Sequence, residues 1–203
     1  MTGARRAAAL AGAALAGYLA GTFPSADVAS RLATGGRVDL RRAGTGNPGA
    51  INAAQQLGTR WGIGVLVADA AKGALGAGVG RALAGPGGAY AAATTSIAGH
   101  IAPVWTQFRG GKGVATSAGA CLAVFPAYFP IDAAVAAVGA ARSRNAEAAV
   151  RLSSTVWVAA AVLWWWRGWP NLWGPTPTIG LPLFATGGAG MILAKFATAR
   201  RAS

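Results

Sequence analysis

The stretch GHIAPVWTQFRGGKGVATS, residues 99–117, decides both the fold and the chemistry of this chain. An apolar, aromatic run ends there at a cationic glycine loop, and a second apolar run begins directly after it. Three glycines surround the lysine of this loop: Gly110, Gly111 and Gly113. Because glycine has no side chain, backbone N–H groups and the ammonium of Lys112 can approach and bind an anion. The guanidinium of Arg109 adds hydrogen-bond donors that suit phosphate or carboxylate. The alternative is a tight turn between two membrane helices with ordinary positive-inside charges.

The loop is not the P-loop of nucleotide-binding proteins. Gly113, rather than Ser or Thr, follows Lys112, and Thr106 stands where the first glycine of that motif belongs. The loop is therefore either an anion site of another kind or a tight turn between two membrane helices.

The composition is that of an integral membrane protein. Of the 203 residues, 54% are hydrophobic and only 11% are charged, and the mean hydropathy is +0.43. Soluble domains carry about 25% charged residues. Each membrane span requires about 20 apolar residues, so about five to seven spans fill nearly the whole chain. We therefore predict an all-α bundle that forms a single polytopic membrane domain over residues 1–203.

The charge of the chain is strongly positive, at +13 from 18 Lys+Arg against 5 Asp+Glu. The cations lie in short loops between apolar runs, where no helix or strand could enter a groove of a nucleic acid. This arrangement excludes a nucleic-acid partner. Anionic membrane lipids and phosphorylated substrates are the predicted partners. The chain has one cysteine, Cys121, and one histidine, His100. Since cysteine clusters and multi-histidine zinc sites need more ligands, we predict neither a metal nor a cofactor.

The first polar loop, residues 31–52, contains a second glycine-rich stretch, GTGNPGAIN. Its glycines are Gly44, Gly46 and Gly49. They bracket the hydroxyl of Thr45 and the amide of Asn47, and we expect Pro48 to open a helix with Asn47 as its N-cap. A helix N-terminus after such a turn is a candidate anion site, and a solvated cytoplasmic loop is the alternative. Asp27, just before this loop, is either a headgroup-level anion or a partner for an arginine.

The apolar run 61–84 contains two further features. Asp69 and Lys72 are three residues apart and lie on one helical face, either as a functional pair or as a structural ion pair. Gly76 and Gly80 are spaced for close helix packing.

The other apolar runs supply the remaining spans. Residues 1–21 form a first span, or alternatively a secretory signal peptide, and the stretch 21–25 interrupts it. Residues 114–141 form one kinked span or two short ones, 155–166 form a tryptophan-rich span, and 183–197 form the last. Four basic loops and the C-terminus are predicted to lie on the cytoplasmic side: residues 31–42, 109–112, 142–151 and 200–201.

The sequence lacks common catalytic arrangements. It contains no G-x-S-x-G elbow of a serine hydrolase, and Trp105, not a carboxylate, stands five residues after His100. The two glycine-rich loops offer Arg, Lys, Asn and hydroxyl groups, a set that binds phosphate and stabilises charge without an obvious side-chain base.

These residues resemble the acyl-phosphate:glycerol-3-phosphate acyltransferases, the PlsY family. Residues 39–52 resemble its D-[IL]-R-x-x-G-[ST]-G-N-x-G-x-x-N motif, and residues 69–73 resemble its D-x-x-K-G. Residues 99–117 resemble its G-H-x-x-P-V-x-x-x-F-[KR]-G-G-K-G-V-A-T block. The likeness runs in order over roughly residues 10 to 120.

The resemblance implies a bundle of about seven transmembrane helices with Gly-rich cytoplasmic loops, in a bacterial plasma membrane. It implies an enzyme of phospholipid biosynthesis that moves an acyl chain from acyl-phosphate to the 1-hydroxyl of glycerol-3-phosphate, giving lysophosphatidic acid without a metal. By match, Thr45, Asn47 and Lys112 are expected at the reacting centre. The expected substrate-binding residues are Arg41, Gly44, Gly46, His100, Arg109, Gly110, Gly111 and Gly113. A substrate phosphate would take the proton.

The chain departs from the family pattern in several places. Gln55 stands where the family has Arg, Ile51 stands where it has Thr, and residues 192–200 lack the His and Asn of its C-terminal motif. Arg151 is the predicted replacement for the missing cation. Two other classes remain open. One is a catalytically silent paralogue that binds phospholipid precursors or regulates a true acyltransferase, and the other is a small-anion transporter, which would require an inverted repeat.

Overall fold

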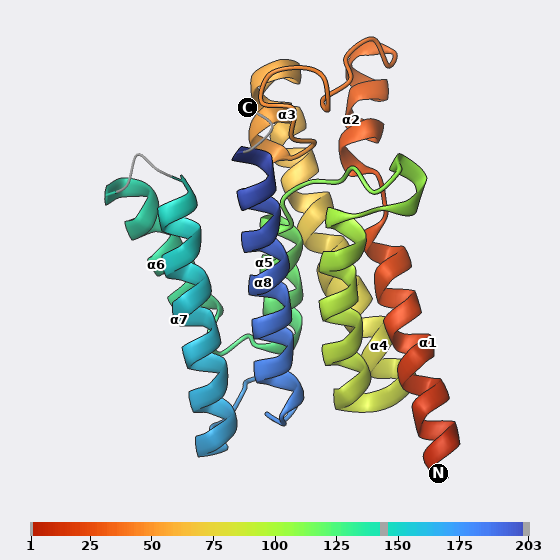
Figure 1. The fold of residues 1–203 in the computed structure, drawn as a ribbon, viewed down its shortest axis with the longest axis vertical. Helices are drawn as coiled ribbons and strands as arrows, with labels where there is room; N and C mark the ends of the chain where they lie inside the picture. Colours follow the sequence, from red (N-terminus) through yellow and green to blue (C-terminus); the bar gives the residue numbers. More distant parts are fainter. Residues whose placement is uncertain (1, 143–145, 201–203) are drawn as a thin grey trace.

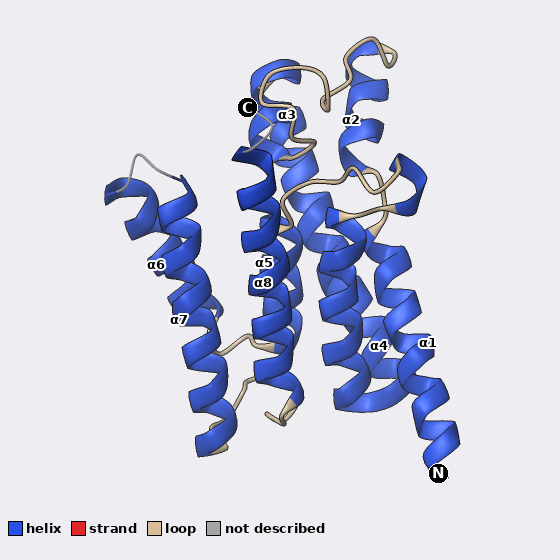
Figure 2. Ribbon diagram, viewed as in Figure 1, coloured by secondary structure: helices blue, strands red, loops and turns tan. Residues whose placement is uncertain are grey.

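The computed structural model describes residues 2–142 and 146–200, and every regular element within these ranges is a helix (Figures 1 and 2). The helices are α1 (Gly3–Gly21), α2 (Ser25–Thr34), α3 (Ala50–Leu57), α4 (Thr59–Ile101), the 3-10 helix η1 (Val104–Thr106), α5 (Val114–Val124), α6 (Phe129–Arg142), α7 (Ala146–Arg167) and α8 (Gly180–Arg200). Four stretches of the described chain are long and apolar enough to cross a membrane: Gly3–Thr34, Thr59–Thr106, Glu147–Arg167 and Gly180–Ala199. The predicted all-α membrane architecture is confirmed.

Helix α4 is a hairpin of two arms. Ala84 (φ −144°, ψ 28°) and Gly85 (φ 60°, ψ −150°) leave the helical region, and the helix resumes at Pro86, as a proline in a first turn allows. Gly85 supplies the positive φ that the turn between the two arms requires. With the two arms separated, seven helical segments of the described chain run along the bundle: α1, both arms of α4, and α5 to α8 (Figure 1).

Glycines let the helices around α4 approach one another closely, as predicted for Gly76 and Gly80. A Cβ at Gly80 would collide with the carbonyl of Gly88 on the other arm of α4. A Cβ at Gly76 would lie 3.5 Å from the Cα of Gly17 on α1. Gly17 itself leaves no room for a side chain, because a Cβ there would collide with the carbonyl of Ala92. The three segments therefore pack backbone against backbone, as membrane helices with small residues do.

Helix α5 packs against the first arm of α4 in the same way. A Cβ at Gly119 would collide with the carbonyl of Ala70, and a Cβ at Gly73 would collide with the carbonyl of Thr116. The main hydrophobic core lies beside this contact, where the second arm of α4 meets α5, α7 and α8. The loop that precedes α5 therefore leads into a helix that is packed closely against α4.

The C-terminal half differs from the expected spans in two respects. Residues 114–141 fall in two helices, because Phe125 (φ −140°, ψ 52°) ends α5. Arg151, predicted in a basic loop, lies inside α7, since an alanine-rich segment with Glu147 in its first turn favours a helix from Ala146 onward. The part of that predicted loop at residues 143–145 lies outside the described residues.

The basic loops gather at one end of the bundle. Helices α2 and α3, the loop between them, η1 and the C-terminal end of α8 lie at this end, and the N-terminus lies at the opposite end (Figure 1). The break predicted at residues 21–25 is the joint between α1 and α2. The described parts of the basic loops 31–42 and 109–112 therefore share one end of the bundle with the end of α8.

Candidate functional site

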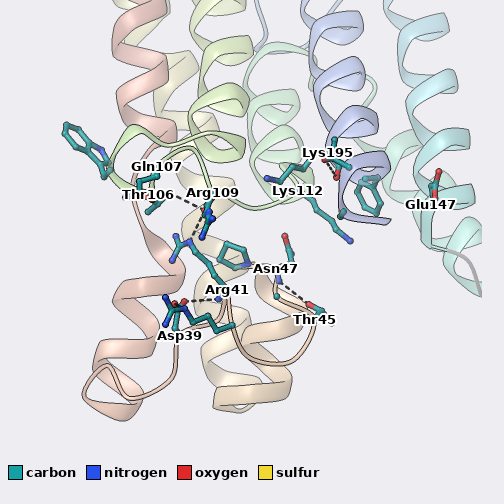
Figure 3. Close-up of a pocket in the computed structure, with 18 residues that line it drawn as sticks. Asp39, Arg41, Thr45, Asn47, Thr106, Gln107, Arg109, Lys112, Glu147 and Lys195 are labelled. Carbon is teal, nitrogen blue, oxygen red and sulfur yellow. Dashed lines mark hydrogen bonds and ion pairs between the residues drawn. The ribbon is translucent and has the colours of Figure 1, made fainter. Parts of the chain in front are cut away.

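A cavity of about 1040 Å³ opens at the end of the bundle that carries the basic loops (Figure 3). The first polar loop, the loop after η1, the start of α7 and the end of α8 line it. It brings together seven of the predicted site residues: Arg41, Thr45, Gly46, Asn47, Arg109, Gly110 and Lys112. Other predicted residues lie outside its lining: Gly44, His100, Gly111, Gly113 and Arg151.

The first polar loop is held by one buried amide, Asn52. Its Nδ2 donates to the carbonyls of Leu40 and Ala43 at 2.9 and 3.0 Å, and its Oδ1 accepts from the Thr45 backbone N–H at 3.0 Å. Gly44 has a φ of +58°, and a Cβ there would collide with Asn52 Oδ1. Gly44 therefore faces Asn52 rather than the cavity. Its role is to shape the loop that places Thr45 at the cavity.

Asn47 is not the N-cap of α3, contrary to our prediction. The helix starts at Ala50, its N-cap is Gly49, and no side chain makes a cap hydrogen bond there. The Gly49 N–H donates to the Asn47 carbonyl at 2.8 Å, so a tight turn through Pro48 separates Asn47 from the helix. Asn47 instead lines the cavity, and its backbone N–H lies 3.4 Å from Thr45 Oγ1.

The second glycine loop folds back onto the end of α4. The Gly110 and Gly111 N–H groups donate to the carbonyls of Ile101 and His100 at 3.1 and 3.2 Å. A Cβ at Gly110 would collide with the His100 carbonyl, and a Cβ at Gly111 would collide with the His100 imidazole. Gly113 then adopts a φ of +87° as the N-cap of α5. The N–H groups of Gly110 and Gly111 are thus engaged within the protein, and Arg109, Gly110 and Lys112 of this loop line the cavity.

Behind this loop lies a buried polar cluster centred on Asp69. Its Oδ1 lies 2.9 Å from Lys72 Nζ and 3.5 Å from His100 Nδ1, and it also accepts a hydrogen bond from Ser25 Oγ. Lys72 Nζ donates to the Phe23 carbonyl at 3.1 Å, at the joint between α1 and α2. The pairing predicted for Asp69 and Lys72 is confirmed. The cluster connects the joint between α1 and α2 to α4. His100 belongs to this cluster and therefore lies behind the cavity.

The arginines of the first loop are paired with carboxylates. Arg41 Nη1 lies 2.5 Å from Asp27 Oδ1, and Arg42 Nε lies 3.6 Å from Asp39 Oδ2. Asp27 is therefore an arginine partner, the second of its two predicted roles. In contrast, Arg109 forms no ion pair with any carboxylate of the described ranges.

The far wall of the cavity contains residues that the sequence did not single out, among them Glu147, Lys195 and Phe196. Lys112 Nζ lies 4.3 Å from the centroid of the Phe196 ring. The sequence could have identified Lys195 as a candidate site residue, because it is the only charged residue among residues 180–199. Arg151, the expected replacement cation, instead pairs with Glu147 at 2.5 Å, and its side chain is 66% exposed.

The chain is similar to known proteins over most of its length. A family model described as glycerol-3-phosphate acyltransferase matches residues 11–200. A glycerol-3-phosphate acyltransferase of Synechococcus sp. (strain JA-3-3Ab) is 38% identical over 161 residues, which cover 78% of this chain and 75% of the relative. Glycerol-3-phosphate acyltransferase 2 of Moorella thermoacetica is 46% identical over 109 residues. That match covers 54% of this chain and 55% of the relative, so the chain spans about half the length of this protein.

Two solved structures share the fold. One is PlsY, described as an integral membrane glycerol 3-phosphate acyltransferase, in its glycerol 3-phosphate form. It has a TM-score of 0.74 and 26% identity, and the match covers 94% of this chain and 90% of PlsY. The lysophosphatidic acid form of PlsY has the same TM-score of 0.74 at 24% identity, with 95% and 90% of the two chains covered.

Proposed function

Since this chain belongs to the glycerol-3-phosphate acyltransferase family, we propose that it transfers an acyl chain from acyl-phosphate to the 1-hydroxyl of glycerol-3-phosphate. The products are lysophosphatidic acid and inorganic phosphate. The observation that carries this proposal is the cavity at the end of the bundle, where two glycine-rich loops and α8 bring arginines and lysines together beside membrane-spanning helices. Both proposed substrates carry phosphate, and one also carries an acyl tail that requires access from lipid.

The cations of the cavity suit the charges of this reaction. Arg109, Lys112 and Lys195 line it without a carboxylate partner in the described ranges. Preorganised cations stabilise charge that develops during reaction, and arginine binds phosphate through two donors at once. We assign Arg41 and Arg109 to substrate phosphate, with Arg41 also holding the first loop in place.

The transfer itself is a displacement at the acyl carbonyl. The 1-hydroxyl oxygen of glycerol-3-phosphate attacks the carbonyl carbon, the bond from that carbon to the phosphate oxygen breaks, and the phosphate leaves with the electron pair. Thr45 and Asn47 orient the acceptor or the carbonyl oxygen, and Lys112 stabilises the developing charge. The two carboxylates that line the described cavity, Asp39 and Glu147, are each paired with an arginine. We therefore assign the hydroxyl proton to a substrate phosphate.

The orientation follows from the distribution of cations. The protein would lie in the bacterial plasma membrane, with the cavity, the basic loops and the C-terminus on the cytoplasmic side and the N-terminus outside. The gathering of the arginine-rich loops at one end supports this orientation, because positively charged loops remain cytoplasmic. The cavity would then face the compartment that contains the water-soluble acceptor.

An acyl-transfer assay on the purified protein tests the proposal. The protein in detergent receives palmitoyl-phosphate and glycerol-3-phosphate, and lysophosphatidic acid is measured for the parent, for Lys112→Ala and for the control Arg167→Ala. We expect product from the parent and the control, and a loss of about a hundredfold or more in Lys112→Ala. A folded parent that binds either substrate and makes no product would contradict the proposal and leave a silent paralogue.

A further inference from the structure

Lys195 lies where a membrane helix normally carries no charge. It belongs to the apolar stretch Gly180–Ala199 of α8 and is its only charged residue. A charge within a span is costly and marks a functional site by default. A lysine near the end of a span often extends outward to lipid headgroups. Lys195 is instead partly buried and lines the cavity.

The residue after Lys195 positions a second cation. Lys112 Nζ lies 4.3 Å from the centroid of the Phe196 ring, a separation at which cation–π attraction holds an ammonium group. Figure 3 shows Lys112 and Lys195 on the α8 side of the cavity, and Arg41 and Asp39 on the side of the first loop. Two adjacent residues of α8 thus contribute to the cavity wall: Lys195 is itself a cation, and Phe196 contacts the ammonium of Lys112.

These two lysines have no anionic partner within the described part of the chain. None of its carboxylates forms an ion pair with Lys112 or Lys195. Two cations that line the same cavity without a carboxylate partner give it a positive potential, which favours the binding of an anion. The wall is therefore arranged for a ligand that brings its own negative charge.

We propose that Lys195 and Lys112 form an anion subsite for the phosphate of the acyl donor, with Lys195 as a phosphate-binding residue. This inference rests on the proposed acyltransferase function and deepens it. Phe196 and Ala199 of the same helix give the subsite an apolar border, which suits a ligand with a phosphate head and a hydrocarbon tail. The opposite wall, with Thr45 and its loop, is polar and suits the water-soluble acceptor.

The subsite also has a role in the transfer step. When the carbonyl carbon separates from the phosphate oxygen, the electron pair stays on the departing phosphate. Lys195 stabilises the charge that accumulates there, so its loss should affect both the binding of the donor and the rate of transfer.

Matched variants of Lys195 test the subsite. Lys195→Met removes the charge and keeps the length of the side chain, and Lys195→Arg keeps the charge. Arg167→Met, at the end of α7 away from the cavity, is the control. Binding is measured with hexadecyl phosphate, an alkyl ester that cannot transfer an acyl group, so the result does not depend on turnover. Inorganic phosphate serves as the ligand without a tail.

We expect Lys195→Met to weaken hexadecyl phosphate binding about tenfold or more, Lys195→Arg to restore most of it, and Arg167→Met to leave it unchanged. Inorganic phosphate should bind more weakly than hexadecyl phosphate and show the same dependence on Lys195. In the transfer assay, Lys195→Met should raise the KM for palmitoyl-phosphate and lower kcat, without changing the KM for glycerol-3-phosphate.

Unchanged binding of hexadecyl phosphate to Lys195→Met would overturn the subsite, as would a rise confined to the KM for glycerol-3-phosphate. A parent protein that binds hexadecyl phosphate through Lys195 but makes no product would contradict the acyltransferase proposal and leave the binding subsite in place.

Discussion

Arg41 joins the two glycine-rich loops, because its Nε donates a hydrogen bond of 2.8 Å to the carbonyl of Arg109, 68 positions further along the chain. The same guanidinium donates to both carboxylate oxygens of Asp27 on α2, at 2.5 and 3.1 Å. A planar guanidinium can hold two such partners at once, whereas the ammonium of lysine is a point charge without this geometry. Arg41 therefore fixes the relative position of the two loops that line the cavity.

The first prediction concerns this link. Arg41→Lys keeps the charge and loses the simultaneous contacts, so we expect acyl transfer to fall about tenfold or more. Backbone hydrogen exchange at residues 105–109 should become faster in this variant. Arg42→Lys is the matched control, because Arg42 is 87% exposed in a longer ion pair of 3.6 Å. Equal activity in the two variants would show that Arg41 contributes only its charge.

The second prediction concerns Asn52, which is 1% exposed and makes three hydrogen bonds to the first loop. Asn52→Ala leaves two carbonyls, one of them buried, and one N–H without these partners, and we expect a loss of about 2–4 kcal/mol in the free energy of unfolding. Thermal unfolding in detergent measures the change, and Gln55→Ala, at an exposed position of α3, is the control. An unfolding temperature unchanged from that of the parent would show that water replaces these bonds.

The third prediction tests the contact between α4 and α5. Gly119→Ala places a Cβ against the carbonyl of Ala70, and we expect the helices to separate at a cost of about 1–3 kcal/mol or more. Gly78→Ala is the matched control, since a Cβ there meets nothing within 4 Å. It should match or slightly exceed the parent in stability, because alanine favours a helix over glycine. Gel filtration and thermal unfolding of both variants distinguish these outcomes.

The fourth prediction concerns the buried pair Asp69 and Lys72, whose side chains are 2% and 7% exposed. Lys72→Met removes one partner and leaves a buried carboxylate, which typically costs about 3–5 kcal/mol. The double variant Asp69→Asn with Lys72→Met should recover part of this loss, because neither charge remains buried. If the single variant unfolds at the temperature of the parent, the pair is not structural and the surrounding joint is held in another way.

Local sequence was sufficient for several features of the fold and the site. The break at residues 21–25, the face shared by Asp69 and Lys72 and the close packing at Gly80 follow from residue spacing and side-chain size, so the sequence predicted them. The glycine loop around Lys112 was recognisable for the same reason.

Tertiary packing decided the rest. Lys195 reaches the cavity only because α8 lies beside α4, which no local pattern encodes. Asn47 lost its expected capping role because Pro48 and Gly49 form a tight turn before α3 begins. Arg151 was assigned to a loop because its charge marks a membrane boundary, although the alanine-rich segment around it extends α7 back to Ala146.

The most direct test of the central proposal is the parallel measurement of both products in one reaction. The purified parent protein receives palmitoyl-phosphate and glycerol-3-phosphate, and lysophosphatidic acid and inorganic phosphate are quantified over time. The proposed displacement predicts equal amounts of the two products, formed only when both substrates are present and lost together in Lys112→Ala. Phosphate release that proceeds without glycerol-3-phosphate, or the absence of lysophosphatidic acid from a folded protein, would contradict it.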